Sequence, residues 1–141
     1  MVRRWLLGVA LMAGFAVPLH AETLKFHAVM GGSSEVPASN STGTGAADAT
    51  LNTETHKLIY DVTFSGFSSA VTMAHFHGPA AVGANAGVQV PLGKAPTSPI
   101  HGDVTLTEAQ QQQLMSGQWY ANVHTANHPK GAIRGQLTPS K

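Results

Sequence analysis

Histidines are the residues of this sequence whose type and spacing could do chemistry. The chain has eight in 141 residues, and two of them flank Phe76 in Ala74-His75-Phe76-His77. On a β-strand, residues i and i+2 project from the same face, and two strand rises place their Cα atoms ~6.6 Å apart. Two imidazoles at that separation can converge on one metal ion, while Phe76 points the opposite way, into the core.

A second histidine segment shows the same alternation. In Trp119-Tyr120-Ala121-Asn122-Val123-His124 the apolar residues share one face, so His124 lies on the other face of a strand. The sequence therefore predicts one metal site made by His75, His77 and His124. His128, four residues further on, and Met73, on the same strand face as His75, are the candidates for a fourth ligand.

The ligand types limit which metal ions the site would bind. An imidazole set suits Cu(II) or Zn(II) and does not suit magnesium or calcium, so copper is predicted, with zinc as the alternative. The competing interpretation is that these are surface or loop-anchoring histidines whose ring N–H groups bind backbone carbonyls. No catalytic residue is assigned, because the chain has no nucleophile elbow, no phosphate-binding glycine loop and only scattered carboxylates.

The first residues predict the compartment. Arg3 and Arg4 precede an apolar stretch from Trp5 to Val17, and Ala21 offers a small residue for cleavage. This is the layout of a secretory signal peptide, and the stretch is shorter than the ~20 residues that a membrane span needs. We therefore expect residues 1–21 to be removed and 22–141 to act in the periplasm or outside the cell, with no membrane span.

Composition sets further limits on the mature chain. Six Lys and Arg stand against seven Asp and Glu without a basic cluster, which argues against nucleic acid or an anionic membrane as partner. The chain has no cysteine, so neither a disulfide nor a lipid anchor is available and stability must come from packing.

Alternating apolar residues predict eight short strands, with a polar and glycine-rich loop over residues 31–44. One helix is expected near residues 107–116, where Thr105 and Glu108 have the spacing of a capping box and Gly117 provides a stop. The predicted fold is mostly β: a Greek-key-like β-sandwich or flattened barrel with one short helix. The predicted strands cover 24–30, 46–51, 57–64, 71–77, 87–92, 103–105, 119–124 and 132–137.

The ordered motifs resemble the chordin-type (CHRD) domain family over essentially the whole mature chain. They are Ala74-His75-Phe76-His77-Gly78-Pro79-Ala80, Tyr120-Ala121-Asn122-Val123-His124-Thr125, Gly131-Ala132-Ile133-Arg134-Gly135-Gln136, and the earlier Ser34-Glu35-Val36-Pro37 and Gly43-Thr44-Gly45. One departure is Ala132, where the family commonly has an acidic residue that would pair with Arg134.

The resemblance implies either an extracellular module that binds proteins, as in animal chordins, or a small exported bacterial protein. The His-x-His strand is also similar to the copper-ligating strand of Cu,Zn superoxide dismutases, which implies an inward Phe76 and a covering segment over residues 78–100. That segment has no Asp or Glu and the chain has no cysteine pair, both of which depart from a dismutase.

Three functions are therefore expected, in decreasing order. The first is exported metal binding, with a role in copper handling. The second is a protein-interaction module with structural histidines, and the third is a redox enzyme of the dismutase type.

Overall fold

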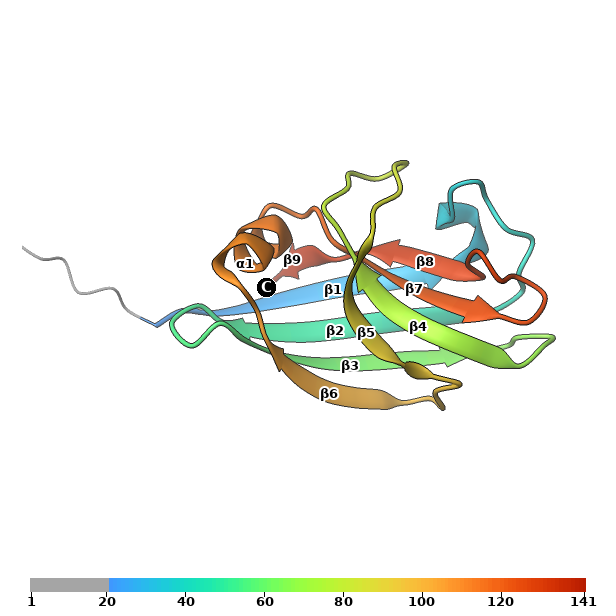
Figure 1. Ribbon diagram of the computed structural model, residues 1–141, viewed down its shortest axis with the longest axis horizontal. Helices are drawn as coiled ribbons and strands as arrows, with labels where there is room; N and C mark the ends of the chain where they lie inside the picture. The colour runs from blue at the N-terminus through green and yellow to red at the C-terminus, as the bar shows by residue number, and fades with distance from the viewer. Residues whose placement is uncertain (1–20) are drawn as a thin grey trace, which may run out of the picture.

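The fold is known from a computed structural model that describes residues 21–141 (Figure 1). The predicted signal peptide lies, except for Ala21, outside the described residues. The strands are β1 (Thr23–Gly31), β2 (Thr44–Asn52), β3 (Lys57–Ser65), β4 (Val71–His77), β5 (Val88–Lys94), β6 (Ile100–Thr105), β7 (Tyr120–Thr125), β8 (Ile133–Gln136) and β9 (Thr138–Ser140); the helices are the 3-10 turn η1 (Gly32–Ser34) and α1 (Glu108–Met115).

Eight of these strands form one antiparallel sheet that curls into a nearly closed barrel. Their order is β5-β4-β7-β8-β1-β2-β3-β6, and β9 pairs with β1 off this path. The end strands β5 and β6 come near each other, as the curved sheet in Figure 1 shows. Neighbours that are distant in sequence, such as β3 with β6, give the Greek-key-like order. The predicted fold class is confirmed in its flattened-barrel form.

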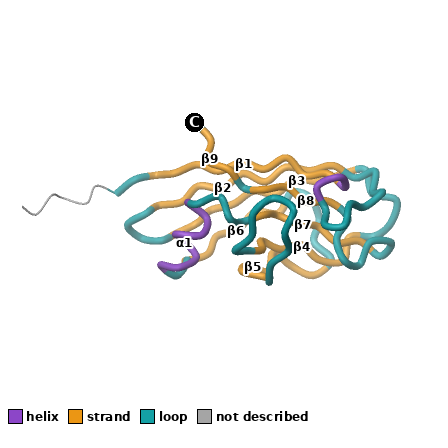
Figure 2. Tube along the Cα trace, turned by 90° about the horizontal axis from the view of Figure 1, so that it is seen from above, coloured by secondary structure: helices purple, strands orange, loops and turns teal. Residues whose placement is uncertain are grey.

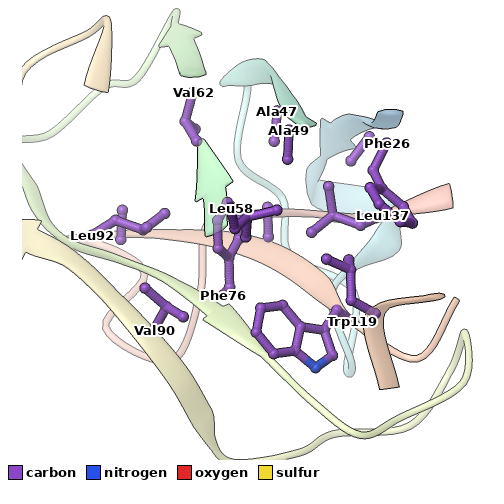
Figure 3. Packing of buried hydrophobic residues seen from close by; sticks show 14 of the residues in the cluster. Phe26, Ala47, Ala49, Leu58, Val62, Phe76, Val90, Leu92, Trp119 and Leu137 are labelled. Atoms are coloured by element: carbon purple, nitrogen blue, oxygen red, sulfur yellow. The ribbon is translucent and has the colours of Figure 1, made fainter. Parts of the chain in front are cut away.

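The interior is filled by the alternating apolar residues of the strands. Phe76 lies near Trp119 in this cluster (Figure 3), with ring centroids 6.3 Å apart, and Tyr60 meets the edge of Phe76 at 5.4 Å. Phe76, Trp119 and Val123, which lie on the strand faces predicted to be apolar, are all fully buried, as is Ile133. Burying such side chains contributes about 1.5–3 kcal/mol each, so packing can hold a chain that has no disulfide.

The short helix α1 lies at one end of the barrel, away from the loops at the opposite end (Figure 2). Its predicted position is confirmed, but its predicted cap is wrong. Thr107 accepts from the backbone N–H of Gln110, and the Gln110 side chain accepts from that of Thr107. Thr105 cannot cap the helix because it still belongs to β6, opposite Lys57. Gly117 follows the helix with φ +71°, the conformation expected of a terminating glycine.

Candidate metal centre

Strands β4 and β7 bring the three predicted histidines together. They are neighbours in the sheet, with Met73 opposite His124 and His75 opposite Asn122. The core side is fixed by buried Phe76 and Val123. Because successive side chains alternate across a strand, His75, His77 and His124 all project from the outer face of the barrel. The predicted facing is confirmed.

The three imidazoles converge. One ring nitrogen from each can be chosen so that all three lie within 4.8 Å of one another. The Nδ1 of His75 lies 3.3 Å from the Nε2 of His124. The ring of His75 stands nearly perpendicular to that of His77, with centroids 5.3 Å apart. This spacing can accommodate a metal ion among three nitrogen ligands.

The Nδ1 atoms of two of these histidines form hydrogen bonds with backbone carbonyls. The Nδ1 of His77 lies 2.9 Å from the carbonyl oxygen of Ala86, and that of His124 lies 2.9 Å from the carbonyl oxygen of Pro129. A carbonyl only accepts, so both Nδ1 atoms carry the proton and both Nε2 atoms present lone pairs. The Nε2 of His77 is buried and has no hydrogen-bond partner among the described residues. Such a nitrogen is suited to a metal.

The surroundings keep two of the rings neutral. Burial, with smaller effects from the neighbouring His124 and His77, lowers the pKa of His75 to about 4. Burial is also the main reason that the pKa of His77 is below its ordinary value. Metal ligation needs neutral imidazole, so at neutral pH these two rings are already in the ligating form.

Tyr120 and Arg134 support His77 from the outside. The rings of Tyr120 and His77 are stacked, with centroids 4.9 Å apart and planes 1° from parallel. The guanidinium of Arg134 lies over the Tyr120 ring, 3.5 Å from its centroid. The same group donates to the carbonyl oxygen of Ala84 at 2.6 Å. Arg134 is therefore buried and occupied with a loop, and it does not stand free to guide an anion.

The segment that covers the histidines is shorter than predicted. Residues 78–100 were expected to act together as a lid, but β5 belongs to the sheet and pairs with β4. Only the loop 78–87 connects the two strands; it projects from the end of β4 (Figure 1), and its Ala86 carbonyl reaches His77. A second loop, 35–43, meets it where the Asn85 side chain donates to the carbonyl oxygen of Val36 at 2.9 Å. His124 is only 9 % exposed, and its loop contact is with Pro129, after β7.

The two candidates for a fourth ligand are placed differently. Met73 lies opposite His124 across the strands and is 37 % exposed. His128 lies in the loop after β7, where its Nε2 is 2.8 Å from the side-chain oxygen of Asn40 and its Nδ1 is 3.4 Å from the hydroxyl of Thr125. The ring nitrogens of His128 thus already have partners outside the three-histidine cluster. Met73, by contrast, is the direct cross-strand neighbour of His124.

Sequence reasoning missed Glu35 as part of this region. Its carboxylate accepts from the side-chain amide of Asn122, which is the residue opposite His75. Burial raises the pKa of Glu35 to about 7, against the smaller opposing effects of Arg134 and Asn122. One signal was available: Glu35 is the only acidic residue between Glu22 and Asp48.

The protein is thus an antiparallel, nearly closed β-barrel with three converging imidazoles on its outer face. The CHRD domain family matches residues 26–137, from the core of β1 to the end of β8, and the chain belongs to that family. The predicted resemblance is confirmed. No curated protein and no solved structure matches the chain. In the described part of the chain, no helix has the length and apolar character of a membrane span.

Proposed function

We propose that this chain is an exported metal-binding protein that holds one copper or zinc ion through His75, His77 and His124. The observation that carries the proposal is the pair of Nδ1–H···O=C bonds to Ala86 and Pro129. They fix the tautomers of two rings, so that the Nε2 atom of each presents a lone pair, and one ring nitrogen from each of the three histidines lies within 4.8 Å of the other two. Partners of this kind orient the ligands of metal sites and raise their basicity.

The donor set supports copper first and zinc second. Three neutral imidazoles suit both ions, and a three-ligand site leaves a position for a further ligand. Met73 would supply a soft sulfur beside His124, which favours copper. His128 would first have to release Asn40 and Thr125. We therefore rank Met73 above His128 as the fourth ligand, with water as the remaining choice.

The cellular part of the proposal rests on sequence. The signal-peptide layout of residues 1–21 favours a periplasmic or secreted protein, where copper and zinc are accessible. A role in copper handling is proposed because an all-imidazole ligand set suits copper. If the chain binds neither ion, a protein-interaction module with structural histidines is the better interpretation.

Calorimetric titration of residues 22–141 with Cu(II) and, separately, Zn(II) tests the site. We expect one ion per chain and a loss of affinity of more than about 100-fold in the double variant His75→Ala/His77→Ala, since even a residue that orients a ligand is worth about 10–100-fold. The matched control is His27→Ala/His101→Ala, which removes two exposed histidines elsewhere on the barrel. Equal binding by wild type and the first double variant would refute the site.

A further inference from the structure

A pocket of about 760 Å³ lies next to the candidate metal centre. It opens between the loops 35–40 and 128–131, and His77, Ala86 and Tyr120 contribute to its wall. Small-molecule sites are commonly concavities of about 300–1,000 Å³ with a few polar groups that fix the ligand. The pocket therefore has the size of a ligand site, and its polar groups decide what it would hold.

Glu35 is the buried polar group of this pocket. Its side chain is part of the lining, although the residue is only 8 % exposed. The Oε1 atom accepts from Asn122, whereas Oε2 receives no hydrogen bond or salt bridge from any described residue. Both oxygens lie against Gly131, where a Cβ would be 2.6 Å from each of them. A buried carboxylate normally has a cationic or hydrogen-bonding partner, so Oε2 has an unused capacity to accept.

Arg134 does not supply that partner. Its guanidinium is taken by the carbonyl of Ala84, by the side-chain oxygen of Asn85 at 3.1 Å and by the face of Tyr120. Its charge lowers the pKa of Glu35, but the effect of burial is larger, and the pKa stands at about 7. The carboxyl group thus remains without a direct cation.

Most other polar side chains of the pocket are already paired. Asn40 binds His128, and Asn85 binds the backbone of Val36. Lys130 lines the pocket, is exposed and forms no salt bridge with a described residue. A ligand would therefore find a carboxylate at the buried wall and an ammonium group at the solvent side.

We propose that this pocket binds an amino acid or short peptide, whose ammonium group donates to the Oε2 of Glu35 and whose carboxylate faces Lys130. Val36, Pro37 and Pro129 supply the apolar part of the wall beside these two groups. The ammonium group pairs with the Glu35 oxygen that receives no hydrogen bond from any described residue. The inference does not depend on metal binding, because neither Glu35 nor Lys130 belongs to the three-histidine cluster.

The test is a titration of metal-free protein with glycylglycine, followed by NMR of the backbone amides. We expect saturable shifts at Gly131, Asn122 and Lys130. N-acetylglycylglycine, which has lost the ammonium group, should bind about tenfold more weakly or worse, the size expected for one charge-assisted hydrogen bond. Equal binding of the two peptides, or no saturation with glycylglycine, would overturn the proposal.

The variant Glu35→Gln separates the carboxylate from the shape of the pocket. Glutamine keeps an oxygen for Asn122 but carries no charge, so glycylglycine binding should fall about tenfold or more. The matched control Glu54→Gln changes an exposed turn residue and should leave peptide binding unchanged. Zinc affinity of Glu35→Gln should stay at the wild-type value, so failure of the pocket and failure of the metal site are distinguishable. Wild-type peptide affinity in Glu35→Gln would contradict the proposal.

Discussion

Two regions of the outer surface carry potential metal ligands on neighbouring strands, and the ring nitrogens of their histidines have different hydrogen-bond partners. The first is the His75–His77–His124 cluster on β4 and β7. The second, here called the His–Asp row, consists of His27, Asp48, Asp61 and His101, which are successive cross-strand partners on β1, β2, β3 and β6.

Each imidazole of the His–Asp row is held by its own carboxylate. The Nδ1 of His27 lies 2.7 Å from a carboxylate oxygen of Asp48, and His101 pairs with Asp61 in the same way. All four side chains are substantially exposed. In the cluster, by contrast, His77 and His124 bind backbone carbonyls beneath covering loops. Within the described residues only the cluster brings three ligand nitrogens together.

The comparison teaches what turns histidines into a candidate metal centre. Both regions have the required residue types on adjacent strands. Only in the cluster do backbone carbonyls fix the tautomers, and only there does burial leave a nitrogen without a partner. The difference comes from loops: the loop 78–87 supplies the Ala86 carbonyl that binds His77, and the loop after β7 supplies the Pro129 carbonyl that binds His124.

Outside the three histidines themselves, the largest effect on metal affinity is expected at Tyr120. Its hydroxyl group lies 3.1 Å from the backbone nitrogen of Ala86, whose carbonyl binds His77. Tyr120→Phe keeps the ring stacked on His77 but releases the loop, so zinc and copper affinity should fall about tenfold, as for other residues that orient a ligand. Calorimetry measures this loss. An affinity equal to wild type would show that the Tyr120 hydroxyl does not position His77.

The next effect is a pH dependence of the metal-free protein. The pKa of His75 is about 4 in the folded chain and ordinary, near 6.5, in the unfolded chain. Between these values the unfolded state takes up a proton that the folded state refuses, so stability is present above pH 6.5 and is lost as the pH falls towards 4. Because His75 is only half-buried, solvent screening limits the change to about 1 kcal/mol.

Urea unfolding at pH 7.5 and pH 4.5 measures this change. The variant His75→Ala/His77→Ala should lose less stability between the two pH values than wild type does. The control His27→Ala/His101→Ala should show the wild-type difference. Identical pH profiles for all three proteins would contradict the claim that burial lowers the pKa of the cluster histidines.

The smallest effect is expected in the His–Asp row. His27→Ala removes an exposed pair with Asp48, and such pairs contribute about 0–1 kcal/mol. We expect unfolding free energies within about 1 kcal/mol of wild type and unchanged metal affinity. A row variant that lost metal binding would instead place the ion in the His–Asp row and reverse the comparison.

The strands and their facing could be predicted because alternation is a local property. Phe76 and Val123 indicate the core side directly, and the outward positions of His75 and His124 follow from them. The hydrogen bonds that hold the rings could not be predicted, since they depend on loop conformation: the carbonyls of Ala86 and Pro129 both belong to loops. Glu35 shows the same limit: its contact with Asn122 joins residues 87 positions apart.

The helix cap illustrates a different limit. The sequence Thr105-Leu106-Thr107-Glu108-Ala109-Gln110 contains two overlapping capping-box patterns, one starting at Thr105 and one at Thr107. Only the pairing of β6 with β3 decides between them, because it holds Thr105 in the sheet. Local patterns therefore placed the helix, and tertiary pairing selected its first residue.

The most direct test of the metal centre is the anomalous difference map of crystals of residues 22–141 loaded with one equivalent of Zn(II). We predict one peak bounded by His75, His77 and His124, with zinc–nitrogen distances of about 2.0–2.1 Å. A peak at His27 or His101 with none at the cluster, or no peak at all in zinc-loaded crystals, would contradict the account.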